Sequence, residues 1–378
     1  MTTSLAMQTD PLNTMDVWEE VVVRVKMEYL SERQNFPWII GFSGGKDSTL
    51  VLQAVFEALL RIPPSRRTRE VHVVSNDTLV ESPLVISHLD VTTKKVDDAA
   101  KALGLPLVTV RTYPDPDKTF WVLLIGKGYP SPNMSMRWCT DRLKIVPTGT
   151  YIKNQVSKSG SVIVVLGVRS DESHARSRSI AKHRNERGSE LTEHDRLSNA
   201  FIYRPIVDLS LEEVWEILGT NPAAWGGDHS SLIQLYRDSE GGECPVVLSS
   251  DEAPGCGTSN SRFGCWTCTV VEKDKSLQGF IDSGKTHYEP LVSFRDWLKS
   301  IRNLPEMRQA LRRNGRLTFD QGTGKHIPGP FTIQARQEIL GRLLEVQEEF
   351  GATLIQPQEI DAIKSIWADE LIQSGGVS

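Results

Sequence analysis

The chain has 378 residues and a formal net charge of −5, with 39% hydrophobic and 24% charged residues. This length can bury a full core and hold two or three subdomains. The negative charge argues against binding nucleic acid through one broad basic surface, although it leaves room for a local basic groove. No apolar run approaches a membrane span, and the N-terminus lacks the pattern of a secretory signal, so we expect a cytoplasmic protein that does not enter a membrane.

Helices and buried strands are expected to alternate along the first two thirds of the chain. The first helix is predicted at residues 14–33, and another at 83–103. Strands are predicted at 38–42, 71–77, 106–110, 162–168 and 201–208. The first four strands are apolar on both faces, which is typical of a parallel sheet covered on both sides. We therefore predict an α/β fold, a parallel sheet with helices on both faces.

The loop after the first strand has the composition of an anion-binding site. It reads Ser43-Gly44-Gly45-Lys46-Asp47-Ser48 and leads into a helical pattern. The two glycines allow a sharp turn and close approach to a ligand, while the free N–H groups and the dipole at the helix start favour negative charge. Ser43 and Ser48 add hydroxyl donors, and Lys46 adds a cation.

Two better-known phosphate loops do not match this stretch. The Walker pattern fails because Lys46 stands where its second glycine is required, and the dinucleotide fingerprint fails as well. The loop resembles the PP-loop of the ATP pyrophosphatase (adenine nucleotide α-hydrolase-like) superfamily. The resemblance implies that ATP is held by its pyrophosphate part and cut between the α and β phosphates, with Lys46 and Asp47 in catalytic roles. Asp47 is suited to hold Mg²⁺ or to orient the loop, because hard cations prefer carboxylate oxygen.

Further candidate nucleotide ligands follow other strands of the sheet. Asp77 ends the second strand, where adenine or ribose would lie, although it can equally form a strand-end turn. The run "LGVRSDES" after the fourth strand resembles a segment of phosphoadenylyl-sulfate reductases. There Gly167 would allow close approach to the nucleotide, and Arg169 and Arg176 could neutralise phosphate charge. Arg176 can also be an ordinary loop arginine.

Two later segments are predicted to be loops. Residues 169–200 are charged and poor in apolar side chains, which favours a solvated loop that could close over a nucleotide. Residues 237–262 are rich in Gly, Ser, Pro and Asp, and two helices are expected at 332–350 and 357–374. The predicted domains are an N-terminal helix at 1–34, the PP-loop domain at 35–236, a cysteine-rich segment at 237–290 and a mostly helical region at 291–378.

Four of the five cysteines are clustered, which calls for a metal explanation. The clustered residues are Cys244, Cys256, Cys265 and Cys268, and the last two form a CxxC pair. Alone, such a pair can be a redox couple, half a zinc site or part of an iron–sulfur site. Four thiolates can converge on one centre, and spacing does not distinguish zinc from iron–sulfur.

The fifth cysteine, Cys139, lies in "RWCTDRLKIVP". This segment resembles the "CCxxRKxxP" stretch of adenylyl-sulfate reductases, whose paired cysteines bind a [4Fe–4S] cluster, but Thr140 replaces the second cysteine. Arg142 and Lys144 would lower the pKa of a nearby thiol. We favour Cys139 as a thiol that carries sulfur or faces substrate. A ligand role for Cys139, leaving Cys244 or Cys256 free, stays open.

Together, the PP-loop, "RWCTDR" and "RFGCWTCTVVEKDKS" at residues 262–276 resemble the DndC/SspD family of DNA phosphorothioation proteins. The resemblance covers about residues 35–290. It implies that ATP activates a DNA backbone phosphate with release of pyrophosphate, and that sulfur from a cysteine desulfurase then replaces a non-bridging oxygen. The implied cofactors are ATP, Mg²⁺ and a [4Fe–4S] cluster on Cys244, Cys256, Cys265 and Cys268. The implied partners are the desulfurase, other phosphorothioation proteins and DNA, which the acidic chain would bind with partner help.

Three alternatives are weighed against this hypothesis. A sulfonucleotide reductase would attack through a C-terminal Glu-Cys-Gly cysteine, and no cysteine follows Cys268. A non-catalytic iron–sulfur or zinc scaffold in a DNA-modification complex is less consistent with the intact Ser43–Ser48 loop. A tRNA thiolase normally brings an RNA-binding module, which we do not find in the sequence.

Overall fold

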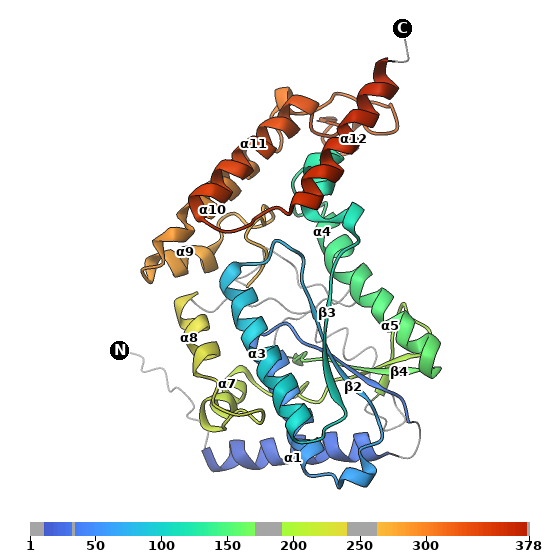
Figure 1. Ribbon diagram of the computed structural model, residues 1–378, viewed down its shortest axis with the longest axis vertical. Coiled ribbons are helices and arrows are strands. Elements are labelled where there is room, and N and C mark those ends of the chain that lie inside the picture. Colours follow the sequence, from blue (N-terminus) through green and yellow to red (C-terminus); the bar gives the residue numbers. More distant parts are fainter. Residues whose placement is uncertain (1–10, 32–34, 171–190, 240–262, 376–378) are drawn as a thin grey trace.

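The centre of the protein is a six-stranded, mostly parallel sheet, seen in a computed structural model that describes residues 11–31, 35–170, 191–239 and 263–375 (Figure 1). The strand order is β3-β2-β1-β4-β6-β5, and only β5 is antiparallel to its neighbour. The strands are β1 (Trp38–Gly41), β2 (Val71–Asn76), β3 (Leu107–Thr112), β4 (Val162–Val165), β5 (Leu191–Glu193) and β6 (Ala200–Tyr203). The predicted α/β fold with a parallel sheet is confirmed.

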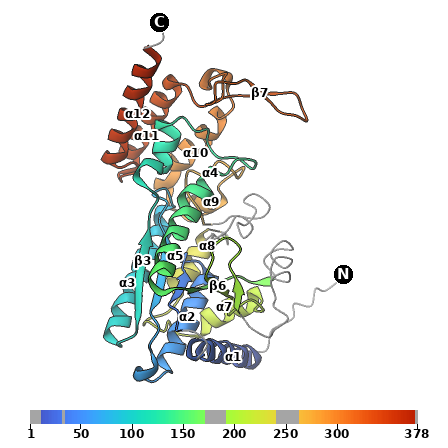
Figure 2. The ribbon, with the colours of Figure 1, turned by 90° about the vertical axis from the view of Figure 1, so that its right-hand side faces the viewer.

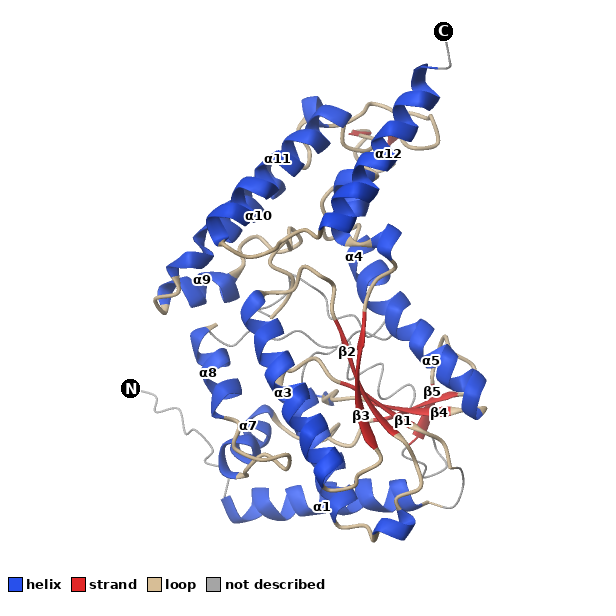
Figure 3. Cartoon of the chain, viewed as in Figure 1, coloured by secondary structure: helices blue, strands red, loops and turns tan. Residues whose placement is uncertain are grey.

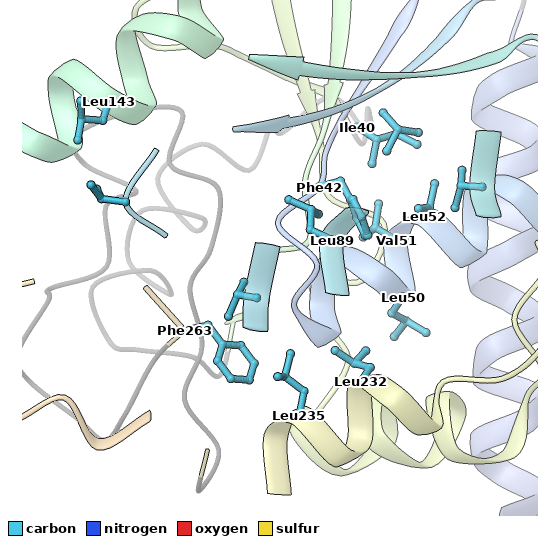
Figure 4. Packing of buried hydrophobic residues seen from close by; sticks show 14 of the residues in the cluster. Ile40, Phe42, Leu50, Val51, Leu52, Leu89, Leu143, Leu232, Leu235 and Phe263 are labelled. Carbon is cyan, nitrogen blue, oxygen red and sulfur yellow. The ribbon is translucent and has the colours of Figure 1, made fainter. Parts of the chain in front are cut away.

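Helices cover both faces of this sheet because successive strand residues point to opposite sides. In β1, Trp38 and Ile40 belong to the larger apolar cluster, whereas Ile39 belongs to a second cluster with Ile152. The first face is covered by α1 (Pro11–Leu30), α2 (Lys46–Leu60), α3 (Pro83–Ala102) and α7 (Leu211–Thr220), and the second by α5 (Val146–Ser159). Figure 4 shows part of the larger cluster, where Phe42 and Val51 lie close to Leu89 of α3.

The C-terminal region is mainly helical, as predicted, and lies beyond the sheet (Figure 3). Its last two helices pack on the segment Val122–Gly126. Trp121 Nε1 donates to Leu354 O at 2.7 Å, and Trp367 Nε1 donates to Ile125 O at 3.1 Å. The elements here are α9 (Lys275–Asp282), α10 (Glu289–Ile301), β7 (Thr318–Phe319), β8 (His326–Ile327), α11 (Ile333–Phe350) and α12 (Pro357–Gly375). The preceding helix, α8 (Ser230–Asp238), instead contacts the start of α2 through Tyr236.

Short helical pieces connect the larger elements. Trp138–Thr140 (α4), the π-helical turn Asp141–Ile145 and α5 follow one another without a break, so Cys139 lies at the start of a long helical segment. The others are the 3₁₀ turns Pro64–Arg66, Pro116–Lys118, Thr286–Tyr288 and Pro305–Met307 and the π-helical turn Val122–Gly126.

Several predicted boundaries differ from the observed ones. β6 ends at Tyr203 rather than at residue 208, because Pro205 lacks the N–H group that a continuing strand would need. β4 ends at Val165, and the chain then passes close to the start of α2. No helix was predicted at the positions of α5, α8, α9 or α10, and neither β5 nor the β7–β8 hairpin was predicted. Of the predicted loops, residues 171–190 and 240–262 lie outside the described residues.

In the described part of the chain, none of the helices combines the length and apolar character needed to cross a bilayer.

Candidate functional site

The loop between β1 and α2 has the backbone of an anion-binding turn. Gly44 has a φ of 76°, a left-handed conformation that favours glycine. Gly45 is the N-cap of α2 and leaves the start of that helix without a side-chain cap. The Ser43 and Ser48 hydroxyls lie 3.1 Å apart, and Ser48 Oγ donates to Gly45 O at 2.9 Å. The loop is therefore fixed by its own two serines, with the helix start directed at its centre.

Three charged side chains meet beside this turn. Lys46 Nζ donates to Asp47 Oδ2 at 2.8 Å, and Arg169 Nε donates to Asp47 Oδ1 at 2.6 Å. Lys46 is 1% exposed and Arg169 is 3% exposed. The structure thus brings together three residues that the sequence placed on two separate segments. The Asp47 carboxylate orients both cations at the loop.

Gly167 is held against the backbone of α2. A Cβ at this position would lie 2.7 Å from both the carbonyl carbon and oxygen of Asp47, and 2.9 Å from Ser48 N. Real Cβ atoms do not approach that closely, so glycine is required here for chain packing. The structure thus shows Gly167 in close approach to the backbone at the start of α2, and its predicted approach to a nucleotide stays a prediction.

Tyr236 contributes to this site and was missed by the sequence analysis. Its hydroxyl accepts a hydrogen bond from Lys46 N at 3.1 Å, although 190 residues separate the two in the sequence. The ring is buried against Trp215 and Phe263. No sequence signal marks this tyrosine, because only the folding of α8 against the loop creates the contact.

The half-buried His88 lies near the glycine turn, and the buried His229 is close enough to His88 for the two rings to interact. His88 Cδ2 would lie 3.6 Å from a Cβ at Gly44, and the His88 ring forms a hydrogen bond with the Gly44 backbone. Burial lowers the pKa of His88, and it lowers the pKa of His229 to about 4, with Asp228 opposing and His88 reinforcing the shift in His229. Both rings are therefore neutral at pH 7 and add no positive charge to the loop.

Asp77 forms the strand-end turn that was the alternative interpretation of this residue. Its Oδ1 accepts from Leu79 N at 2.8 Å, and Leu79 has a φ of 64°. Burial raises the pKa of Asp77, and the hydrogen bond from Leu79 partly offsets this shift. Contact of Asp77 with a nucleotide stays a prediction.

The CxxC segment is attached to the chain that follows β2. Glu81 and Cys265 form an antiparallel bridge, and two backbone bonds flank it: Ser82 N to Gly264 O at 3.1 Å, and Trp266 N to Val80 O at 3.0 Å. Cys268 N donates to Cys265 O at 3.0 Å, which closes a tight turn. The buried Arg295 holds this turn from α10 through a 2.7 Å bond from its Nε to Cys268 O.

Cys265 lies among charged groups at the end of β2. The Thr78 hydroxyl is 3.4 Å from Cys265 Sγ, and Lys144 Nζ is 3.1 Å from Glu81 Oε1. Burial is the main cause that raises the pKa of Cys265. Glu81 and Cys139 raise it further, whereas Lys144 and Thr78 oppose the shift. Lys144 therefore lowers the pKa of Cys265, and its predicted effect on the pKa of Cys139 stays a prediction.

The predicted cluster ligands are only partly described. Cys265 and Cys268 share one tight turn, and Cys139 is close enough to influence Cys265. Cys244, Cys256 and Arg176 lie outside the described residues. Within the ranges that the structure describes, no group of three or more His, Cys, Asp or Glu side chains is arranged to hold a metal ion. The described residues alone therefore do not provide a four-thiolate site.

The residues of the Ser43–Ser48 loop fit the phosphate chain of a nucleoside triphosphate. The glycine turn, the first turn of α2 and the two cations on Asp47 provide both backbone and side-chain donors for phosphate oxygens. A bound Mg²⁺ would add charge neutralisation on these oxygens, and Asp47 is the loop carboxylate that could contact it. This chemistry suits transfer or cleavage at a phosphate chain.

Comparisons with solved structures give similar folds at low scores. One is the phosphoadenylyl-sulfate reductase of Candida auris, with a TM-score of 0.35 and 14% identity, covering 62% of this chain and 94% of that one. Another is the NH3-dependent NAD synthetase of Campylobacter jejuni, with a TM-score of 0.35 and 11% identity, covering 78% of this chain and 98% of that one. At such scores the likeness carries no information about substrate.

Comparisons of sequence are more informative. An uncharacterized protein of Methanocaldococcus jannaschii is 28% identical over 154 residues, which are 41% of this chain and only 27% of that protein. Residues 37–271 match the family model of the phosphoadenosine phosphosulfate reductase domain. That range includes β1, the glycine loop, Arg169 and the CxxC pair. The chain therefore belongs to the phosphoadenosine phosphosulfate reductase domain family, within the PP-loop superfamily.

Proposed function

We propose that this chain is an ATP pyrophosphatase and sulfurtransferase of DNA phosphorothioate modification. The observation that carries the ATP part is the pairing of Lys46 and Arg169 on Asp47 beside the glycine turn. This arrangement provides fixed positive charge and backbone donors where the β and γ phosphates would lie. The DNA part rests on the sequence resemblance to the DndC/SspD family.

The proposed chemistry has three steps. A non-bridging oxygen of a DNA phosphate attacks the α-phosphorus of ATP, and pyrophosphate leaves. The outer sulfur of a Cys139 persulfide then attacks the activated DNA phosphorus, forming a P–S bond while the P–O bond to AMP breaks. A thiol reductant then supplies two electrons and cleaves the remaining S–S bond, which leaves the phosphorothioate on DNA and frees the Cys139 thiol. Lys46 and Arg169 stabilise the charge that develops on the leaving pyrophosphate, and Asp47 keeps both cations in position. Activation is needed because an oxygen of a phosphate diester is a poor leaving group.

Sulfur delivery is assigned to Cys139, with a cysteine desulfurase as donor and other phosphorothioation proteins as partners. Cys139 is half-buried at the start of a helical segment and close enough to Cys265 to influence it. The [4Fe–4S] cluster on Cys244, Cys256, Cys265 and Cys268 stays a separate prediction. No step above depends on it.

The direct test is the identity of the ATP products. Purified protein with its partners, Mg-ATP and DNA is expected to release AMP and pyrophosphate, and sulfur is expected in the DNA backbone. Release of ADP and phosphate would overturn the α–β cleavage. Absence of ATP binding in the wild-type protein would favour the non-catalytic scaffold.

A sulfonucleotide reductase is the second candidate, and the family match favours it. This enzyme would release sulfite from an adenylyl sulfate in the presence of a thiol reductant, without consuming ATP. The two assays can be run on one preparation. Sulfite release without pyrophosphate release would replace the phosphorothioation hypothesis by the reductase.

A further inference from the structure

A two-stranded ribbon, residues 308–331, projects from the C-terminal region between α10 and α11. At its base Arg308 pairs with Phe331, and Gln309 N donates to Pro330 O at 2.8 Å. Near its tip β7 pairs antiparallel with β8, so that Thr318 faces Ile327 and Phe319 faces His326. Figure 2 shows β7 and its loop extending away from α11 and α12.

The base of the ribbon is tightly packed. A Cβ on Gly329 would lie 1.8 Å from Leu311 O, so the two arms of the ribbon are in direct backbone contact at this point. The buried Arg308 donates from Nε to Gly329 O at 2.7 Å and from Nη1 to Arg302 O at 2.6 Å. Burial, together with the charges of Arg312 and Arg302, lowers the pKa of Arg308 to about 10. The base is thus a rigid, positively charged support.

The ribbon carries an excess of positive charge on an acidic protein. Residues 308–327 contain five Lys and Arg residues but one carboxylate, Asp320, while the whole chain has a net charge of −5. Asp320 is used in the turn, where its Oδ1 accepts from Gly322 N and Thr323 N. Among the ion pairs between described residues, none involves a cation of this ribbon.

Apolar side chains are exposed among these cations. Leu317 is 56% exposed and Phe319 is 55% exposed, near the tip. Alternation of cations with exposed aromatic or apolar groups suits a partner that has both phosphates and base or sugar faces. A two-stranded β-ribbon also has the width that the major groove of DNA admits. A membrane surface would need a broader apolar face than Leu317 and Phe319 offer.

The ribbon is connected to the segment that carries Cys139. The Arg313 guanidinium lies 4.6 Å from the Tyr129 ring centroid and donates to Lys127 O. Tyr129 packs on Trp138 with ring centroids 5.4 Å apart, and Cys139 follows Trp138 directly. A polymer bound along the ribbon would therefore lie on the part of the molecule that presents this thiol.

We propose that residues 308–331 are a docking element for double-helical DNA. Arg312, Arg316 and Lys325 pair with phosphates, and Phe319 with Leu317 contacts bases or sugars in a groove. This proposal rests on the proposed function for the choice of DNA, but it concerns binding and not sulfur chemistry. Local charge on this element reconciles an acidic chain with a nucleic-acid substrate.

The test uses charge reversal at two side chains that form no hydrogen bond or ion pair with the described residues, Arg316→Glu with Lys325→Glu. The matched control is Arg66→Glu with Lys158→Glu, which makes the same change in net charge at exposed positions before β2 and β4. Binding of the full chain to a labelled short DNA duplex is measured by fluorescence anisotropy, without ATP, over a range of salt. The same DNA as a single strand, and anionic phospholipid vesicles, serve as comparison probes.

The ribbon variant is expected to bind duplex about tenfold more weakly, with a salt dependence reduced by about two units of log–log slope, while the control stays near wild type. Equal binding by both variants, or an equal loss in both, would overturn the proposal. Preference of the wild type for vesicles or single strands would overturn the duplex assignment. Because the assay contains no ATP, failure of pyrophosphate release leaves this result standing, and the reverse also holds.

A second variant, Phe319→Ala, tests the proposal independently in case the charge-reversal variant does not fold. Phe319→Ala removes the exposed ring but no charge, and it is expected to weaken duplex binding without changing the salt slope. Unchanged affinity of Phe319→Ala would remove the aromatic part of the proposal. Near-identical thermal unfolding of all variants checks that the ribbon remains folded.

Discussion

Arg169 Nε donates a hydrogen bond of 2.6 Å to Oδ1 of Asp47, and the two side chains are only 3% and 11% exposed. Lys46 Nζ lies 2.8 Å from the other carboxylate oxygen, so one acid contacts two nearly buried cations beside the loop. Removal of one partner from a buried ion pair is far more unfavourable than the loss of a surface pair. The contacts of Asp47 with Lys46 and Arg169 are therefore expected to contribute both to the stability of the protein and to the arrangement of the candidate nucleotide site.

Asp47→Asn is expected to lower the free energy of unfolding by about 3–5 kcal/mol and to abolish pyrophosphate release. Asp98→Asn is the control, because it breaks the exposed Lys94–Asp98 pair and should leave the stability close to that of the wild type. Urea unfolding measures the first quantity and a coupled pyrophosphate assay the second. Wild-type stability in Asp47→Asn would mean that the buried pair does not form in solution.

Gly167→Ala is expected to destabilise the protein by about 1–3 kcal/mol and to weaken ATP binding, because the new methyl group would displace the backbone of Asp47. Gly219→Ala provides the comparison. Gly219 lies in α7 with no atom within 4 Å of its added Cβ, so alanine there should stabilise by up to about 1 kcal/mol. Calorimetric titration measures the ATP affinity of both variants, and urea unfolding measures their stability. Unimpaired ATP binding by Gly167→Ala would argue against a role for this contact in shaping the loop.

Tyr236→Phe keeps the ring packed but removes the hydroxyl that accepts from Lys46 N. We expect a loss of about 1–3 kcal/mol in stability, from the unpaired backbone donor, together with weaker ATP binding. Tyr151→Phe also loses a buried hydrogen bond, a 2.7 Å contact with His72 Nδ1, but lies away from the loop. Its ATP affinity should match wild type. Equal ATP affinity in both variants would leave Tyr236 with a packing role only.

Acid is expected to destabilise the protein through His229. The pKa of this histidine is about 4 in the folded chain and near 6.5 when unfolded, so the unfolded state binds the proton first. The stability contribution is present above pH 6.5 and is lost as the pH falls towards 4. In His229→Gln, the fall in unfolding free energy between pH 7 and pH 5 should be smaller than in wild type. His326→Gln, at an exposed position, should follow the wild-type curve, and a His229→Gln curve parallel to wild type would contradict the assignment.

Iron content tests the cysteine assignments. Protein purified without oxygen is expected to hold about four irons per chain with acid-labile sulfide. Iron should be lost in Cys265→Ala and Cys268→Ala, and retained in Cys139→Ala. Loss of iron in Cys139→Ala would instead make Cys139 a ligand, which its proximity to Cys265 permits. Zinc in place of iron would contradict the iron–sulfur assignment.

Much of the fold was predictable from local sequence. The buried strands, the helix at Pro83–Ala102 and the two C-terminal helices depend on short-range periodicity, which a single sequence records. The loop at Ser43–Ser48 was likewise recognisable, because a glycine turn between a strand and a helix is a local feature. β5 and the β7–β8 hairpin were missed because strands of two or three residues have too few positions to establish a period.

The sequence by itself determined the parallel α/β sheet, the anion-binding character of the loop and the presence of a cysteine pair. Only the tertiary structure decided which distant residues complete those features: Arg169 on Asp47, Tyr236 on Lys46, and Lys144 with Glu81 beside Cys265. The physical reason is that these contacts depend on how helices and strand ends pack at one edge of the sheet. Side-chain periodicity along a segment carries information about burial, but none about which partner the fold will place against it.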